Sequence, residues 1–188
     1  MINPVRPDEY DFFLPLEGDS MFECGGKQNP HVVKGKNTTY KSWFEGLGYR
    51  HISVDWDGRF GAIERDLRQP LWQEFGQFDM VTNIGTSEHV SDQAGFWENI
   101  HNLTKKHGLY VGQCPYYDGK SWWWHGNYYP TEAFYESFAD LNGWSIERMG
   151  RGLKPPNENL YVRMRKIEDL SFTMPDASLI HFNRMRRR

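Results

Sequence analysis

The sequence of 188 residues predicts one α/β domain, in which helices cover both faces of a mostly parallel sheet. Short apolar runs typical of strands alternate along the chain with segments of helical period, and this order favours parallel strands joined by crossover helices. The last two apolar runs have no helix between them. They therefore predict an antiparallel pair at an edge of the sheet.

The first elements follow an irregular arm over residues 1–19, where several prolines and acids show no clean period. A short strand is predicted over 21–24, where an apolar run ends at two glycines. Residues 38–48 repeat apolar side chains at helical spacing and end in glycine, which predicts a helix and its end. Strands are expected over 51–56, which is β-branched and ends in acids, and over 61–67.

The central elements contain the clearest strand of the chain. A helical turn over 70–76 precedes FDMVTNIG at 78–85, a nearly continuous apolar run typical of a strand covered on both faces. A helix is predicted over 93–108, because its apolar residues share one face and its last turn is basic and ends in glycine. The next strand is expected over 109–114.

The last elements are a helix over 131–143, with Thr131 as its N-cap, and two strands over 144–150 and 159–166. The loop between the two strands spans 151–158. These two strands form the expected antiparallel edge pair.

Composition excludes several classes of function. The net charge of −3 and the isoelectric point near 6.2 give no overall electrostatic footprint for nucleic acid. A local basic tail leaves a nucleic-acid partner open, against the simpler reading of a solvated terminus. The arginines of this tail are Arg184, Arg186, Arg187 and Arg188.

The two cysteines, Cys24 and Cys114, form neither a disulfide framework nor a metal-binding spacing, so they are read as small strand residues and no metal is expected. The chain shows no secretory signal after Met1 and no apolar run long enough to cross a bilayer. A cytoplasmic location without a membrane partner is the expectation.

Ligands of open α/β sheets bind beyond the carboxyl ends of the strands. Small and polar residues gather at four predicted strand ends, and they are Glu23, Gly25, Gly26, Asp55, Asp66, Asn83, Gly85, Thr86, Glu88 and His89. A carboxylate at the end of the second strand can accept two hydrogen bonds from a ribose diol. Glycines in the first turn let a ligand lie against backbone N–H groups. Taken singly, each residue also has a simpler explanation, such as a turn or a helix cap.

The ordered set of motifs resembles the class I S-adenosylmethionine-dependent methyltransferases. The motifs are FECGG, ISVDWDG, ERDLRQPL, FDMVTNIGTSEHV, GLYVGQCP and YYPTEAFYESFADLNGW, and they span roughly residues 20–166. The resemblance implies a Rossmann-like, doubly wound, mostly parallel seven-stranded sheet with an antiparallel last strand. It divides the chain into an N-terminal arm at 1–19, a methyltransferase domain at 20–170 and a basic tail at 171–188.

The resemblance also implies the roles of single residues toward S-adenosylmethionine. Glu23, Gly25 and Gly26 would shape the loop under the methionine part of the cofactor. Asp55 would accept from the ribose hydroxyls, with Asp57 as the fallback.

Asp66 would accept from the adenine amine beside the Leu67 backbone, and Asn83 and Ile84 would line the methionine end. The chain departs from the family at Lys27, which stands where a further glycine is usual. Lys27 or Lys34 could pair with the cofactor carboxylate, or lie in a solvated loop.

The acceptor side is assigned to the aromatic segment CPYYDGKSWWWHGNYYP at 114–130. Its aromatic faces could stack a planar acceptor or contact the sulfonium. The alternative is that Trp122 to Trp124 pack in the domain or against a second copy of the chain. His125 is the first candidate to accept the acceptor's proton, ahead of His89 and Tyr128, with Tyr129 and Asp118 as weaker candidates. The acceptor is expected to be a small or medium-sized molecule.

Two other functions compete with a methyltransferase. A non-catalytic binding module with the same fold is favoured by the altered glycine loop. A nicotinamide-dependent oxidoreductase is disfavoured, because ECGGKQNP lacks the Gly-x-Gly-x-x-Gly pattern at a helix start. Base-amino methylation of DNA is disfavoured as well, since NIGT replaces the usual Asp/Asn-Pro-Pro-aromatic stretch.

Overall fold

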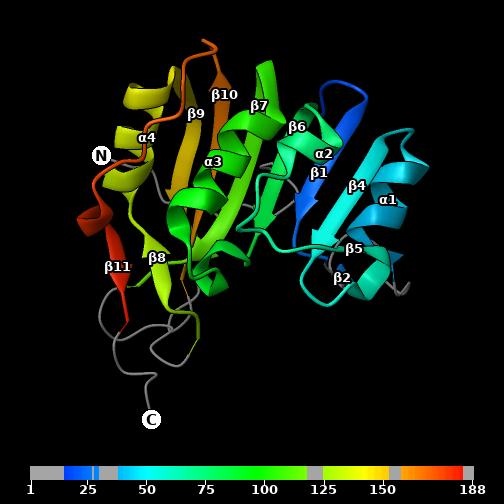
Figure 1. The fold of residues 1–188 in the computed structure, drawn as a ribbon, viewed down its shortest axis with the longest axis horizontal. Helices are drawn as coiled ribbons and strands as arrows, with labels where there is room; N and C mark the ends of the chain where they lie inside the picture. Colours follow the sequence, from blue (N-terminus) through cyan, green and yellow to red (C-terminus); the bar gives the residue numbers. More distant parts are fainter. Residues whose placement is uncertain (1–14, 27, 30–37, 118–124, 153–157, 184–188) are drawn as a thin grey trace.

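The computed structural model describes residues 15–26, 28–29, 38–117, 125–152 and 158–183. Its centre is a seven-stranded sheet of order β5-β4-β1-β6-β7-β10-β9 (Figure 1). Strands β5, β4, β1, β6 and β7 pair in parallel, and β10 is antiparallel to both of its neighbours, β7 and β9. The predicted fold class and the antiparallel edge pair are confirmed.

The seven strands of this sheet are β1 (Ser20–Cys24), β4 (Arg50–Asp55), β5 (Ile63–Glu64), β6 (Phe78–Ile84), β7 (Thr104–Pro115), β9 (Trp144–Arg151) and β10 (Asn159–Lys166). The helices are α1 (Tyr40–Gly46), α2 (Trp72–Phe75), α3 (Gln93–Leu103) and α4 (Glu132–Asn142), with 3-10 turns η2 (Arg59–Gly61), η3 (Ser87–His89) and η4 (Ala177–Leu179). Four short strands form two ribbons, β2 (Gln28–Asn29) with β3 (Thr38–Thr39), and β8 (Tyr128–Pro130) with β11 (Ile180–Phe182).

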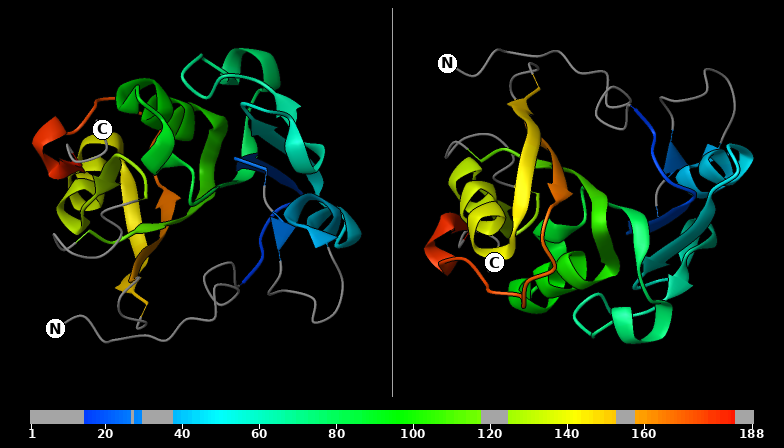
Figure 2. Two further views of the ribbon diagram at one scale, coloured as in Figure 1. Left: turned by 90° about the horizontal axis from the view of Figure 1, so that it is seen from below. Right: turned by 90° about the horizontal axis from the view of Figure 1, so that it is seen from above.

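The helices lie on both faces of the sheet, with α2, α3 and α4 on one face and α1 on the other (Figure 2). The larger core lies under α3 and α4, where Trp97 of α3 contacts the rings of Phe134 and Phe138 of α4. The smaller core joins Tyr40 and Phe44 of α1 to the sheet. Alternate residues of each strand face the two cores.

Helix α3 ends earlier than its sequence predicts. Its last residue is Leu103, because Thr104 is already extended and pairs with Phe78 of β6. Residues 105–108, expected as the basic last turn of this helix, lie in a bulge of β7, where His107 has a φ of +67°. The helical prediction is wrong there, and Lys105 bonds Asp79 at the start of β6 instead.

The β8–β11 ribbon was not predicted. It brings part of the segment assigned to a tail onto the domain, because Ile180 of β11 is buried and pairs with Pro130 of β8. The division of the chain at residue 171 stays a prediction.

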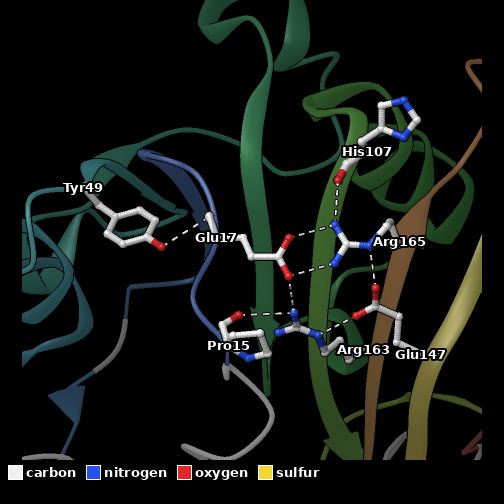
Figure 3. Close-up of polar contacts among 7 residues, drawn as sticks. All are labelled: Pro15, Glu17, Tyr49, His107, Glu147, Arg163 and Arg165. Atoms are coloured by element: carbon white, nitrogen blue, oxygen red, sulfur yellow. Dashed lines mark hydrogen bonds and ion pairs between the residues drawn. The ribbon is translucent and has the colours of Figure 1, made fainter.

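An ion-pair network covers the sheet face beside α1 (Figure 3). Glu17, in the extended segment before β1, accepts hydrogen bonds from Arg163 at 3.2 Å and from Arg165 at 2.9 Å, both on β10. Glu147 on β9 bonds the same two arginines. Arg163 is almost fully buried, so paired charges rather than a helix cover this part of the sheet.

No helix in the described part of the chain is long and apolar enough to cross a membrane.

Candidate active site

A cavity of about 620 Å³ opens where β4, β5 and β6 end. Its wall combines residues that follow these three strands, and they are Asp55, Trp56, Glu64, Arg65, Asp66, Leu67, Arg68, Thr86, His89, Val90 and Ser91. The volume lies within the usual range of small-molecule and cofactor sites. Three of the predicted cofactor residues, Asp55, Asp66 and Leu67, line one cavity together with His89.

The glycine turn after β1 lies beside the chain that leaves β6. Gly25 has a φ of +87°, and a Cβ there would stand 2.1 Å from Oγ1 of Thr86. A Cβ on Gly26 would stand 2.7 Å from the carbonyl oxygen of Arg59. Both positions therefore need glycine for the packing of the protein itself, whatever the ligand. Neither glycine is among the residues that line the cavity.

Glu23 lies beneath this turn, on the α1 face of β1. Its carboxylate is 3% exposed and stands 3.6 Å from Nε2 of His51 on β4. Burial, together with the nearby charge of Lys41, lowers the pKa of His51 to about 4. Glu23 is thus placed under the loop rather than on the cavity wall.

Asp55 ends β4 and fixes the backbone around it. Its Oδ2 accepts from the Gly26 N–H at 2.9 Å, and its Oδ1 accepts from the Trp56 N–H at 2.7 Å. The first bond ties the end of β4 to the glycine turn. Asp57, the fallback residue, instead bonds Arg59, with 3.1 Å between Asp57 Oδ1 and the Arg59 backbone nitrogen.

Asp66 follows β5 and forms a bidentate pair with Arg68. The Arg68 Nη2 lies 2.7 Å from Asp66 Oδ2, and Arg68 Nε lies 2.9 Å from Oδ1. The hydrogen bonds from Arg68 lower the pKa of Asp66, so the carboxylate stays ionised. The loop that carries both residues is held by Asn99 of α3, whose amide donates to the carbonyls of Leu67 and Gln69.

Asn83 and Ile84 end β6 but do not line the cavity. Asn83 is fully buried, and its amide donates to the hydroxyls of Ser87 at 2.9 Å and Tyr110 at 3.2 Å. Its Oδ1 accepts from the Ser87 N–H at 3.0 Å. The side chain therefore shapes η3, the turn that presents Glu88 and His89.

The two histidines predicted as catalytic meet at one carboxylate. Glu88 Oε1 lies 3.3 Å from Nε2 of His125 and 3.7 Å from Nε2 of His89. The Glu88 carboxylate is fully buried, while His125 and His89 are partly exposed. An imidazole held by a buried carboxylate is a typical arrangement for accepting a proton.

Tyr128, the third catalytic candidate, packs in the β8–β11 ribbon with its ring 5.1 Å from that of Phe182. The other described aromatic residues of the segment also pack within the protein. Tyr117 stacks between His181 and Tyr129, at centroid distances of 4.2 Å and 5.0 Å. These rings support the ribbon.

Several residues with a predicted role lie outside the described part of the chain. They are Lys27, Lys34, Asp118, Trp122 to Trp124, and the arginines of the tail.

Trp56 and Thr86 line the cavity but had no predicted role. Trp56 is 75% exposed, which is unusual for an indole and leaves a large aromatic face at the cavity. Its position directly after a strand-end acid was the available signal. Thr86 was placed at the strand ends, but its contact with Gly25 depends on the pairing of β1 with β6.

Solved structures share this arrangement of strands and helices. The 1,6-didemethyltoxoflavin N1-methyltransferase of Burkholderia thailandensis, solved with 1,6-didemethyltoxoflavin and S-adenosylhomocysteine, is 16% identical with a TM-score of 0.60. The match covers 87% of this chain and 78% of that one. The fold is that of the class I S-adenosylmethionine-dependent methyltransferases.

A second methyltransferase of this fold, from Mesorhizobium loti, is 11% identical with a TM-score of 0.58, and the match covers 85% of this chain and 96% of that one. No known protein family and no curated protein matches the sequence. The likeness to the methyltransferases therefore lies in the fold.

Proposed function

We propose that this protein is an S-adenosylmethionine-dependent methyltransferase that acts on a small or medium-sized acceptor. The observation that carries the proposal is the cavity at the carboxyl ends of β4, β5 and β6, with Asp55 and Asp66 on its wall. In an open α/β sheet this edge is where a nucleoside-bearing cofactor binds.

The adenosine part of the cofactor would occupy this cavity. Asp55 would accept hydrogen bonds from the ribose diol, and Asp66 would accept from the adenine amine while it keeps its pair with Arg68. The exposed indole of Trp56 supplies a face for the adenine ring. The methionine part would extend toward Gly25 and Gly26.

Methyl transfer is an in-line displacement. A lone pair of the acceptor O, N or C attacks the methyl carbon, the carbon–sulfur bond breaks, and its electron pair returns to sulfur, which leaves S-adenosylhomocysteine. A proton then leaves the acceptor where the chemistry requires it. His125 and His89 are the groups of this chain that would accept it, because both are partly exposed beside the buried Glu88 carboxylate.

A planar heteroaromatic acceptor is the first class to test. The Burkholderia thailandensis structure with this fold holds 1,6-didemethyltoxoflavin, a small molecule, beside S-adenosylhomocysteine. Three further expectations stay predictions: two copies could associate through the aromatic segment, the basic tail could contact nucleic acid, and the protein could be cytoplasmic.

Calorimetric titration with S-adenosylmethionine and S-adenosylhomocysteine, with NAD as the control, tests the proposal. Binding of both sulfur ligands without NAD is expected. A well-folded sample that binds neither would refute the proposal. Cofactor binding without turnover on a broad panel of acceptors would favour the non-catalytic binding module.

A further inference from the structure

We propose that Glu88, His89 and His125 bind a divalent transition-metal ion beside the cavity, and that zinc is the ion that fits best. Two residues come from η3 and the third from the segment before β8, so His125 follows His89 by 36 positions in the sequence. The spacing in the sequence gave no sign of a metal site, and none was expected. Two imidazoles and one carboxylate are a ligand set used by catalytic zinc sites.

The distances suit one shared ion. Glu88 Oε1 stands 3.3 Å from His125 Nε2 and 3.7 Å from His89 Nε2, and all three ligand atoms lie within 4.8 Å of one another. Tetrahedral zinc with bonds of about 2.0–2.2 Å needs ligand atoms roughly 3.3–3.5 Å apart. His89 closes the remaining gap by a side-chain rotation, because it is 42% exposed. The two imidazole rings meet at 75°, edge to face rather than stacked.

The burial of Glu88 gives an independent reason for a cation. Its carboxylate is 0% exposed, and Oε2 has no hydrogen-bond partner among the residues that the structure describes. A buried carboxylate oxygen without a partner is costly, and a divalent ion that binds Glu88 through both carboxylate oxygens would offset that cost.

The backbone around the cluster is closely held. The Glu88 carbonyl accepts from the Asn127 N–H at 2.7 Å, and the Tyr129 hydroxyl donates to the His125 carbonyl at 2.6 Å. A Cβ on Gly126 would stand 2.7 Å from Cβ of Glu88, so glycine is needed for the two segments to approach. Ligands on a fixed backbone lose little freedom when an ion binds.

The position of the ion would matter for the reaction. His89 also lines the cavity, so the ion would lie next to the proposed cofactor. Three protein ligands leave a coordination position for an acceptor oxygen, and zinc lowers the pKa of a hydroxyl that it binds. With the ion bound, His89 and His125 are its ligands and do not accept the proton, so the proton would go to solvent. The acceptor oxygen would then attack the methyl carbon. This role rests on the proposed function, whereas ion binding does not.

The test measures binding of Zn²⁺ and Co²⁺, each alone, to protein stripped of metal. Calorimetry gives the affinity, and the visible absorption of Co²⁺ reports whether the ion leaves its octahedral water shell. The variants are Glu88→Gln and His125→Asn. The matched control is His107→Asn. His107 is exposed in the bulge near the start of β7, away from the carboxyl ends of the strands, and asparagine tolerates its positive φ.

The wild type and His107→Asn should bind one ion with the absorption of a low-coordinate Co²⁺ site. Loss of a direct ligand should weaken binding by at least about 100-fold, since even outer-shell partners cost 10–100-fold. Folded wild type that binds neither ion would overturn the proposal, as would binding that Glu88→Gln leaves unchanged. S-adenosylhomocysteine binding is measured on the same samples, so failure of the metal site and failure of the proposed function remain distinct.

Discussion

Replacement of Asp55 by asparagine tests the ribose assignment most directly. The two residues have nearly the same shape, but asparagine carries no charge and has one acceptor oxygen in place of two. The carboxylate of Asp55 already accepts from Gly26 at 2.9 Å and from Trp56 at 2.7 Å, and the proposal adds two ribose hydroxyls. Asp55→Asn therefore changes both the turn and the cofactor contact.

The expected magnitudes differ between these two effects. A hydrogen bond to a charged group contributes about 1.5–3 kcal/mol and one to a neutral group about 0.5–1.5 kcal/mol. Loss of the charge should then cost about 1–1.5 kcal/mol for each ribose hydroxyl, or about 30- to 150-fold in affinity for two. The turn loses one of its two N–H acceptors, which should lower the free energy of unfolding by about 1–2 kcal/mol.

Calorimetry with S-adenosylhomocysteine measures the affinity, and urea unfolding measures the stability of the same samples. Asp57→Asn is the matched control, since Asp57 lies two residues away and bonds only Arg59 among the described contacts. Unchanged affinity in folded Asp55→Asn would refute the assignment. A loss seen only in Asp57→Asn would move the ribose contact to that residue.

Three further substitutions probe the cavity, the turn and the pH dependence of stability. Trp56→Ala should weaken S-adenosylhomocysteine by about 5- to 150-fold in calorimetry, because base stacking contributes about 1–3 kcal/mol, and should leave the urea midpoint unchanged since the indole is 75% exposed. Gly25→Ala should lower the free energy of unfolding by about 2–5 kcal/mol, from its positive φ and the contact with Thr86, and a wild-type urea midpoint would contradict this. Burial raises the pKa of Asp79, but hydrogen bonds, above all from Lys105, outweigh this and hold the pKa well below its usual value. The ionised Asp79 carboxylate stabilises the folded protein above its unfolded pKa near 3.8, and this stabilisation is lost as the pH falls below that value. Asp79→Asn should therefore lower the free energy of unfolding by about 1–3 kcal/mol at pH 7. In unfolding measured at several pH values, the free energy of unfolding of the variant should fall less steeply toward acid pH, which is its acid limb. Equal acid limbs in the variant and the wild type would argue against this ion pair.

The sequence alone predicted the order of the seven sheet strands and of the four helices along the chain. Continuous apolar runs such as 78–84 and the N-cap at Thr131 are local signals, and the structure follows them. It also showed which strands end in acids, and the rule that parallel strands present their carboxyl ends at one edge brought Asp55 and Asp66 to one cavity.

Local signals failed where a distant partner decided the outcome. Residues 104–108 read as a basic helix end, yet Thr104 pairs with Phe78 and Lys105 pairs with Asp79. Segment 180–182 carried no strand signal of its own, because β11 exists by pairing with β8.

The candidate site also has features that the sequence predicted and others that only the tertiary structure decided. The sequence predicted His89 and His125 separately as candidate proton acceptors, and only the tertiary structure showed that both lie against the buried Glu88. Likewise, only the tertiary structure showed that Glu23 contacts His51 and that Asn83 bonds Tyr110 in the interior, because these contacts depend on which strands lie side by side. The physical reason is that period and capping act within a few residues, whereas contacts between 88 and 125, or between 25 and 86, depend on strand pairing and packing across the whole domain.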